Sequence, residues 1–359
     1  MLIAGAGMAG LCAAARAREL GAEPVVLEKG TRAGGSMLLS SGVVWRYRSF
    51  DELRAQCPTG DERLQRLVFD RLDDGLAWLE SLGAPVVERE TGNPLTTGVR
   101  FDTAGLTAAL VRAAGGVRLG ERLGARPEGT VVLATGGFQG DRELVARYVR
   151  PAAPLRLRAN PWSSGNGLKL GLDRGAALSA GLDEFYGRNM ADVDFSEADF
   201  VSHAQVFGRH ARIFNDDGVE FFDRAEVSWS EVDLVQATAR QPGARAWYLF
   251  DEAALRERVR YGTVGELVER APTRTEPSEL PFDPPSGTVV ATRVAAAITH
   301  TIGGLRVDDR ARVLNGEGKP VPDLYAAGVD AGGISTGGYA SGLAQALVLG
   351  RTAAETALT

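Results

Sequence analysis

Apolar and polar positions alternate along the start of the chain as they do in a nucleotide-binding βαβ unit. Apolar runs at 1–4 and 24–27 predict strands, and the alanine-rich run at 11–15 predicts the helix between them. The first strand leads directly into Gly5-Ala-Gly7-Met-Ala-Gly10, a G-x-G-x-x-G turn. This order of strand, glycine turn, helix and strand predicts a dinucleotide site.

Each glycine of the turn has a physical role in such a site. Gly5 permits the tight turn, Gly7 lets the backbone approach a pyrophosphate, and Gly10 lets the helix pack close to the strand. The helix N-terminus directs free N–H groups at the phosphates. Glu28 closes the second strand, where a carboxylate meets a ribose hydroxyl. The predicted contacts of this unit are Gly5, Gly7, Met8, Ala9, Gly10, Glu28 and Lys29.

Further elements follow from the same periodicities. A buried strand over 129–134 ends in a glycine turn and predicts a second wall of the nucleotide site. Helices are predicted over 64–79, over 103–114 with Thr103 as its cap, from 166 onward, and over 344–356; strands are predicted over 305–307 and 323–327.

The middle of the chain has a different texture, richer in aromatic and charged residues. We therefore predict an α/β fold with two domains: a Rossmann-like nucleotide domain, discontinuous in sequence over 1–184 and 285–359, and an inserted α+β capping domain over 185–284. A length of 359 residues is sufficient for both.

The glycine turns also narrow the cofactor. Only one G-x-G-x-x-G turn is followed by an acid, so no second unit is present for a nicotinamide nucleotide. Further turns at Gly34, Gly136 and Gly332 suggest convergence on one large ligand. This pattern favours a flavin dinucleotide over NAD.

Composition restricts the partners. The net charge is −6 and no block of basic residues occurs, so neither nucleic acid nor an anionic membrane is expected as a partner. No apolar run approaches the length of a membrane span, and the first strand leaves no room for a signal peptide, so we expect a cytoplasmic protein. Two cysteines make no disulfide framework, and three scattered histidines make no metal site.

Several motifs, taken in order, resemble one family. They are GAGMAG at Gly5, Glu28, GGS at Gly34, ATGGF at Ala134, GNG at Gly165, HTIGGL at His300 and LYAAG at Leu324. The chain thus resembles the superfamily of FAD-dependent fumarate reductases, succinate dehydrogenase flavoproteins and 3-ketosteroid dehydrogenases. In the middle, only the segment from Arg212 to Gly218 is similar to that family's K-R-F-V-N-E motif.

The resemblance implies one FAD held by a split domain, beneath a mobile cap that covers the substrate. The histidine that binds flavin covalently in membrane fumarate reductases is absent between Ser36 and Gly42, which implies a non-covalent flavin. The additional FAD contacts implied are Gly35, Ser36, Ser41, Gly42, Ala134, Thr135, Gly136, Gly328, Asp330, Gly342 and Leu343.

Departures from the family bear on the substrate. Soluble fumarate reductases carry an arginine in a G-x-N-R-L-G-G segment, and this chain has Tyr339 in its place. A phenol is no bidentate carboxylate clamp. The G-Y-x-S-G pattern, with Tyr339 and Ser341, is similar to ketosteroid 4-dehydrogenases, whereas His300 belongs to a fumarate-reductase motif. Arg256 follows a Y-L-x-D segment, about one residue out of register with the fumarate-type proton donor.

These residues predict an enzyme that adds or removes hydrogen across a C–C bond next to a carbonyl. Tyr339 and His300 are the predicted donors to the carbonyl oxygen, with Ser341 and Arg256 as further catalytic candidates. The substrate is expected to be a small molecule, with an electron donor or acceptor that the sequence does not specify. The alternatives are a reductase of an unsaturated carboxylate, an oxidase of a C–N or C–O bond, and a non-catalytic flavin-binding or sensor protein.

Overall fold

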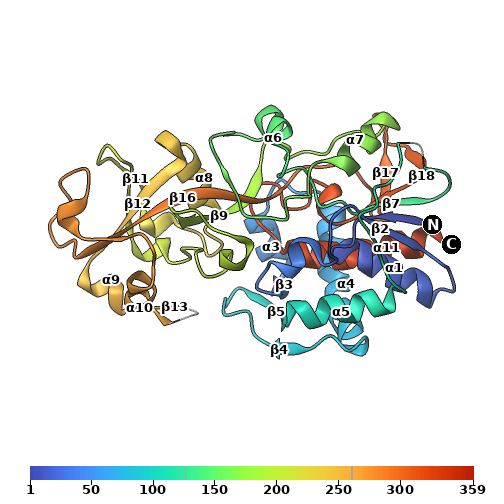
Figure 1. Cartoon of the computed structure of the whole chain (residues 1–359), viewed down its shortest axis with the longest axis horizontal. Coiled ribbons are helices and arrows are strands. Elements are labelled where there is room, and N and C mark those ends of the chain that lie inside the picture. The colour runs from blue at the N-terminus through green and yellow to red at the C-terminus, as the bar shows by residue number, and fades with distance from the viewer. Residues whose placement is uncertain (126, 260–261) are drawn as a thin grey trace. The chain divides into compact units, whose positions relative to one another are not determined.

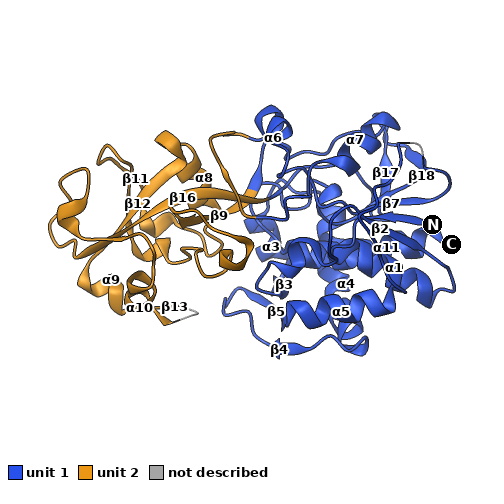
Figure 2. Ribbon diagram, viewed as in Figure 1, with its two compact units in different colours: residues 1–149, 159–185, 300–359 blue, residues 150–158, 186–299 orange. Residues whose placement is uncertain are grey.

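The computed structural model describes residues 1–125, 127–259 and 262–359. The chain divides into two compact units (Figure 2). Unit 1 comprises 1–149, 159–185 and 300–359, and unit 2 comprises 150–158 and 186–299. The predicted discontinuous α/β arrangement is therefore present. The dividing points differ from the predicted ones, because 150–158 and 285–299 belong to unit 2.

A six-stranded sheet forms the centre of unit 1 (Figure 1). Its strand order is β17-β18-β7-β1-β2-β6, in which β18, β7, β1, β2 and β6 run parallel to one another and β17 pairs antiparallel with β18. The strands are β1 (Leu2–Ala4), β2 (Val25–Glu28), β6 (Arg118–Leu119), β7 (Val131–Leu133), β17 (Arg312–Leu314) and β18 (Pro320–Ala326). The predicted strand at 305–307 is wrong: Leu305 and Val307 form only isolated bridges to different partners, so no ladder continues through them.

Helices and a second, antiparallel sheet complete unit 1. The sheet has the order β3-β5-β4, with β3 (Val43–Tyr47), β4 (Val86–Glu88) and β5 (Thr96–Phe101). The helices are α1 (Met8–Glu19), α2 (Gly35–Leu38), α3 (Phe50–Gln56), α4 (Glu62–Ser81), α5 (Thr103–Ala113), α6 (Arg142–Tyr148), α7 (Asn166–Asp173) and α11 (Gly342–Ala357).

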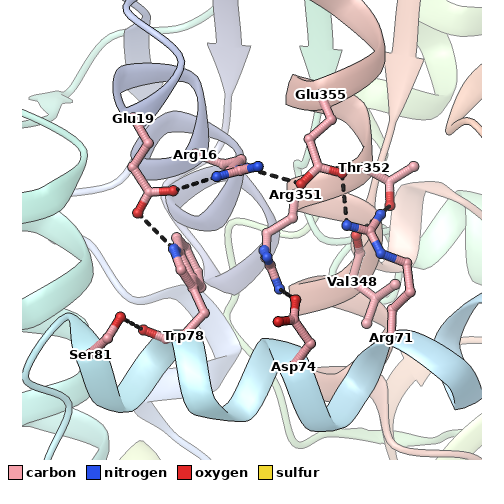
Figure 3. A network of polar contacts seen from close by, with 10 residues as sticks. All are labelled: Arg16, Glu19, Arg71, Asp74, Trp78, Ser81, Val348, Arg351, Thr352 and Glu355. Atoms are coloured by element: carbon pink, nitrogen blue, oxygen red, sulfur yellow. Dashed lines mark hydrogen bonds and ion pairs between the residues drawn. The ribbon is translucent and has the colours of Figure 1, made fainter.

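Polar contacts join α1, α4 and α11 (Figure 3). Glu355 of α11 accepts from Arg16 of α1 at 2.9 Å and from Arg71 of α4 at 2.7 Å. Arg351, a buried residue of α11, pairs with Asp74 of α4 at 2.9 Å. These contacts hold α11 against the two helices that flank it, and α11 begins at one of the candidate sites below.

Unit 2 is built around a long apolar strand, β16 (Val290–Thr301). The sheet order is β11-β10-β12-β16-β15, and β8 and β9 also pair with β16. The strands are β8 (Arg156–Leu157), β9 (Phe185–Ala191), β10 (Arg212–Phe214), β11 (Glu220–Phe222), β12 (Arg245–Phe250) and β15 (Arg274–Thr275), with a separate hairpin of β13 (Arg258–Val259) and β14 (Gly262–Thr263). The helices are α8 (Val232–Ala239), α9 (Glu252–Arg256) and α10 (Val264–Glu269).

The N-terminal cap of α5 is Asp102 and not the predicted Thr103. The Asp102 carboxylate accepts a hydrogen bond from the Gly105 backbone N–H at 2.6 Å. Thr103 lies inside the first turn, and its hydroxyl donates to the Leu38 carbonyl at 3.3 Å. Asp102, which was not predicted as a cap, has the extended backbone conformation of an N-cap residue.

Replacing Asp102 tests this assignment. We expect Asp102→Ala to lower the free energy of unfolding by about 1 kcal/mol, because the cap loses its acceptor, whereas Asp102→Asn retains one and loses a few tenths. Denaturant unfolding followed by circular dichroism measures both variants. A larger loss in Thr103→Ala than in Asp102→Ala would contradict the assignment.

Candidate functional site

Most of the predicted cofactor residues lie at one edge of the six-stranded sheet. The parallel strands β1, β2, β7 and β18 are in register through Ala4, Leu27, Leu133 and Ala326, and each is followed by a predicted contact segment. Carboxyl ends of parallel strands meet at the same sheet edge. Strand β1 has β2 on one side and β7 on the other, which is the topological switch point where nucleotides bind in such sheets.

The glycine turn at β1 combines one crowded and one open glycine. Gly5 has φ +105°, and a Cβ there would lie 2.1 Å from the Ala134 carbonyl oxygen. A Cβ on Gly7 would meet nothing closer than the Gly35 Cα at 3.9 Å. Gly7 is also the N-cap of α1 and has no capping side chain, so the first N–H groups of this helix have no partner within it. Packing therefore requires Gly5, whereas Gly7 leaves space for a ligand.

Glu28 is buried at the end of β2, and its carboxylate organises the surrounding backbone. One oxygen accepts from the Ala6 N–H at 2.9 Å and the other from the Gly30 N–H at 2.8 Å. A carboxylate oxygen has room for a second donor, so the predicted ribose contact is compatible with these bonds. The structure adds that Glu28 fixes the glycine turn itself.

The Lys29 side chain contacts the turn that precedes α7. Its ammonium donates to the Ser164 hydroxyl at 2.6 Å and to the Asn166 side chain at the start of α7. Burial lowers the pKa of Lys29, and the nearby Arg122 adds to the effect. The direct contact of Lys29 in this structure is thus with the 164–166 turn, and its predicted contact with the cofactor stays a prediction.

Asp330 joins two of the converging loops. Its carboxylate accepts from the Thr135 backbone N–H, from the Thr135 hydroxyl at 3.0 Å and from the Gly137 N–H at 3.2 Å. The side chain is 2% exposed, and burial raises the pKa of Asp330 while these donors oppose the rise. The same Thr135 hydroxyl accepts from the Gly167 N–H at 3.0 Å, which brings the start of α7 into the cluster.

The glycine- and serine-rich loop at 34–42 lies beside the glycine turn at its beginning. Gly34 donates to the Ala6 carbonyl at 2.8 Å and forms a bridge with Gly7. Gly35 and Ser36 open α2, and the Ser36 hydroxyl accepts from the Asn160 N–H at 3.4 Å. The far end of the loop, with Ser41 and Gly42, leads into β3.

A second cluster lies at the N-terminus of α11 and contains His300 and Tyr339. Their ring centroids are 5.9 Å apart. The Nε2 atom of His300 is 3.1 Å from where a Cβ on Gly342 would stand, so the ring lies against the first residue of α11. His300 is at the end of β16, and the structure thus brings together two residues that the sequence analysis selected on separate grounds.

The protonation state of His300 follows from its surroundings. Burial lowers the pKa of His300 from 6.5 to about 4, and the positive end of a helix dipole also disfavours an imidazolium. The Nδ1 atom is 3.1 Å from the Thr301 carbonyl oxygen, which can only accept a hydrogen bond. The neutral ring therefore carries its proton on Nδ1, and Nε2 is an acceptor. This tautomer is at odds with the predicted role of His300 as a donor.

Tyr339 is held through its backbone and its ring. The Tyr47 hydroxyl donates to the Tyr339 carbonyl at 2.9 Å, and the Trp45 ring meets the Tyr339 ring edge-on at 5.8 Å. The preceding loop is fixed by the Glu184 carboxylate, which accepts from the Gly337 N–H at 2.7 Å. Sequence reasoning missed Trp45, Tyr47 and Glu184. The alternation of Trp45 and Tyr47 in a strand after Gly42 was the available clue.

The two remaining catalytic candidates have other contacts. Ser341 is the N-cap of α11, and its buried hydroxyl accepts from the Ala344 N–H at 3.3 Å. Gly342 and Leu343, both partly exposed, follow it in the first turn. Arg256 lies on α9 in unit 2 with its side chain 79% exposed, 3.5 Å from the Glu252 carboxylate, as on a solvated helix face. A catalytic role for either residue stays a prediction.

Comparison with known proteins identifies the family of the chain. The sequence matches the family described as FAD binding domain over residues 1–125 and 105–343. The chain belongs to this FAD binding domain family. A probable fumarate reductase, Ifc3, of Shewanella frigidimarina (strain NCIMB 400) is 24% identical over 456 residues, covering 99% of this chain and 74% of that protein.

Solved structures share the fold at low identity. The open conformation of a flavocytochrome c3 fumarate reductase has a TM-score of 0.74 at 21% identity, covering 99% of this chain and 77% of that one. The 3-ketosteroid-Δ4-(5α)-dehydrogenase from Rhodococcus jostii RHA1, in complex with 4-androstene-3,17-dione, has a TM-score of 0.73 at 19% identity, covering 100% and 96%. The predicted resemblance to both branches is therefore confirmed at the level of the fold.

The residues present fit FAD. The open position at Gly7 and the uncapped start of α1 suit a pyrophosphate, and Glu28 lies at the end of β2, where the adenosine ribose is expected. The Asp330 cluster closes the same edge from β7 and β18. Whether the flavin is non-covalent stays a prediction.

The described residues contain neither a membrane-spanning helix nor a group of metal ligands. No helix among them combines the length and the apolar character needed to cross a bilayer. Within 1–125, 127–259 and 262–359, no three His, Cys, Asp or Glu side chains are grouped as metal ligands. The cytoplasmic location stays a prediction.

Substitution of Gly7 tests whether this position is needed for FAD binding and not for folding. We expect Gly7→Ala to weaken FAD binding by about 10- to 100-fold, as an added methyl group in a close-packed contact does, and to leave the melting temperature of the apoprotein unchanged. Gly5→Ala is the control and should lower the apoprotein melting temperature, because its Cβ meets backbone. Wild-type FAD affinity in Gly7→Ala would refute the assignment.

The low pKa of His300 predicts a pH dependence of stability. The His300 imidazole takes up a second proton near pH 6.5 in the unfolded chain but only near pH 4 in the native state. Between these pH values the unfolded state therefore binds more protons than the native state. Stability should therefore fall as the pH is lowered from about 6.5 to about 4, by up to about 1.4 kcal/mol per pH unit from this group. Denaturant unfolding at several pH values measures the slope. His300→Asn should have a shallower slope, and an identical slope would count against a neutral His300.

Proposed function

We propose that the protein is an FAD-dependent oxidoreductase that adds or removes hydrogen across a C–C bond next to the carbonyl of a neutral cyclic ketone or enone. The observation that carries the proposal is the pair of Tyr339 and His300 at the N-terminus of α11. The phenol stands where fumarate reductases carry an arginine, and the imidazole is neutral near pH 7.

The chemistry divides between the cofactor and the chain. When bound, FAD supplies the redox step, exchanging a hydride with the carbon β to the carbonyl. In dehydrogenation, loss of a proton from the α-carbon places negative charge on the carbonyl oxygen. In the reverse direction, the same charge is present until the α-carbon gains its proton, so either direction requires a fixed donor at the oxygen. The Tyr339 hydroxyl is that donor, and its backbone is held by the Tyr47 hydroxyl at 2.9 Å.

His300 contributes an acceptor and no charge. Its Nε2 lone pair lies at the start of α11, and its Nδ1–H is used by the Thr301 carbonyl. A neutral acceptor beside a phenol gives a carboxylate substrate no counter-ion, whereas a neutral carbonyl compound needs none. The pair thus favours a ketone over a dicarboxylate.

One second function has specific support. The His300-Thr-Ile-Gly-Gly segment is a fumarate-reductase motif, and the positive end of α11 at His300 is an environment that favours an anion. The probable fumarate reductase of Shewanella matches 99% of this chain. An unsaturated carboxylate is therefore the alternative substrate, bound without the arginine clamp.

The electron partner is proposed only as a class. A small-molecule or protein donor or acceptor must exchange electrons with the flavin in each cycle. A non-catalytic flavin-binding or sensor protein would need none, and an oxidase would use oxygen. An enzyme should lose its yellow flavin absorbance when mixed with a saturated cyclic ketone without oxygen, and the reduced enzyme should regain that absorbance when mixed with an enone. A non-catalytic sensor should show neither change. Oxygen consumption with amines or hydroxy acids would reveal the oxidase.

Tyr339→Phe tests the proposed donor. We expect the variant to bind FAD as the wild type does and to lose on the order of 10²–10³ in turnover, the usual effect of removing one oxyanion donor. The measurement is the anaerobic rate of flavin reduction by a saturated cyclic ketone such as cyclohexanone, or of reoxidation by 2-cyclohexen-1-one. Ser335→Ala, elsewhere in the same loop, controls for loosening of the backbone. Unchanged turnover in Tyr339→Phe would overturn the role.

A further inference from the structure

Two aromatic residues of β3 share one face of the antiparallel sheet. Trp45 and Tyr47 are two positions apart, so their side chains point to the same side, whereas Val44, the residue before Trp45, points to the opposite side and is fully buried. Their rings meet edge-on, with centroids 5.3 Å apart. Strand β3 directly follows Gly42, the last residue of the glycine- and serine-rich loop.

Tyr47 is the fixed member of the pair. Its side chain is 4% exposed and packs in a cluster with Phe50, Leu53 and Ala340. Its hydroxyl donates to the Tyr339 carbonyl, a contact between residues 292 positions apart in the sequence. The β3 strand is therefore anchored to the segment that carries Tyr339.

Trp45 is the open member of the pair. It is only partly buried, and its ring lies edge-on to Tyr339 at 5.8 Å, while Tyr339 in turn lies 5.9 Å from His300. The rings of Tyr47, Trp45, Tyr339 and His300 thus form a continuous row, from the core to the start of α11. A substrate carbonyl bound by the Tyr339 hydroxyl would bring its hydrocarbon part beside the Trp45 ring.

We propose that Trp45 is a specificity-determining residue, whose indole ring, positioned by Tyr47, forms an apolar wall that selects carbonyl substrates carrying a hydrocarbon ring. An indole ring offers a large apolar surface and no counter-charge. It adds binding energy for a cyclic ketone, adds little for a short acyclic enone, and nothing for a second carboxylate. The inference rests on the proposed function, since it places the substrate carbonyl at Tyr339.

The test compares ring-bearing and acyclic substrates in Trp45→Leu. We expect the rate constant for reoxidation of the reduced flavin, per unit of enone concentration, to fall about 10-fold with 2-cyclohexen-1-one and by less than about 2-fold with 3-penten-2-one. Trp45→Phe keeps an aromatic ring and should recover most of the loss. Trp78→Leu is the matched control. Trp78 lies on α4, outside the row of rings, and its indole N–H donates to Glu19 at 2.7 Å (Figure 3), so neither rate constant should change.

A binding measurement keeps this inference distinct from the proposed function. Cyclohexanone and 2-pentanone are titrated into the oxidised holoprotein under conditions without turnover, and the shift in flavin absorbance gives each dissociation constant. The expected result is a weaker constant for cyclohexanone alone in Trp45→Leu. Equal losses for both ketones, or no loss, would overturn the role of Trp45 even if the wild type turns over enones. Selective weakening in a protein without turnover would refute the proposed function and support the wall.

Discussion

The close approach of the first glycine turn to the turn after β7 is the constraint on which the FAD site depends. A Cβ on Gly5 would lie 2.1 Å from the Ala134 carbonyl oxygen, so no side chain fits between the two turns. Strands β1 and β7 pair in parallel, so their carboxyl ends lie at one edge, and the two turns meet there. The buried carboxylates of Glu28 and Asp330 join the loops of that edge, each through hydrogen bonds from backbone N–H groups.

The second cluster, which contains His300 and Tyr339, depends on the position of helix α11. Helix α11 is held against α1 and α4 by the Glu355 and Arg351 contacts, and its N-terminus fixes the surroundings of His300. Helix dipole and burial both act against a charged imidazole. A histidine can serve as a cationic donor, but His300 is a neutral acceptor here, and we therefore propose Tyr339 alone as the donor.

The local signatures in the sequence predicted much of the nucleotide domain. The glycine turn with Glu28, the buried strand before Ala134 and the last helix are recognisable because turns and periodicities are encoded by neighbouring residues. The cap of α5 and the strand at 305–307 were predicted wrongly, because backbone geometry and ladder pairing decide between similar local patterns. The hydrogen bond from Tyr47 to Tyr339 joins residues 292 positions apart, and no local pattern reports such a contact. The sequence therefore predicted which residues are catalytic candidates. It did not predict the tautomer of His300 or the contacts that hold Tyr339 in place.

The central claim is that the site acts on a neutral carbonyl compound through Tyr339. The most direct measurement mixes the photoreduced wild-type holoprotein, without oxygen, with equal concentrations of 2-cyclohexen-1-one or fumarate and follows the return of the flavin absorbance. The account predicts rapid reoxidation by the enone. With fumarate it predicts a rate at least about 10-fold lower, because this site has Tyr339 in place of the arginine that would bind a carboxylate of fumarate. Faster reoxidation by fumarate, or no reoxidation by either compound, would contradict it.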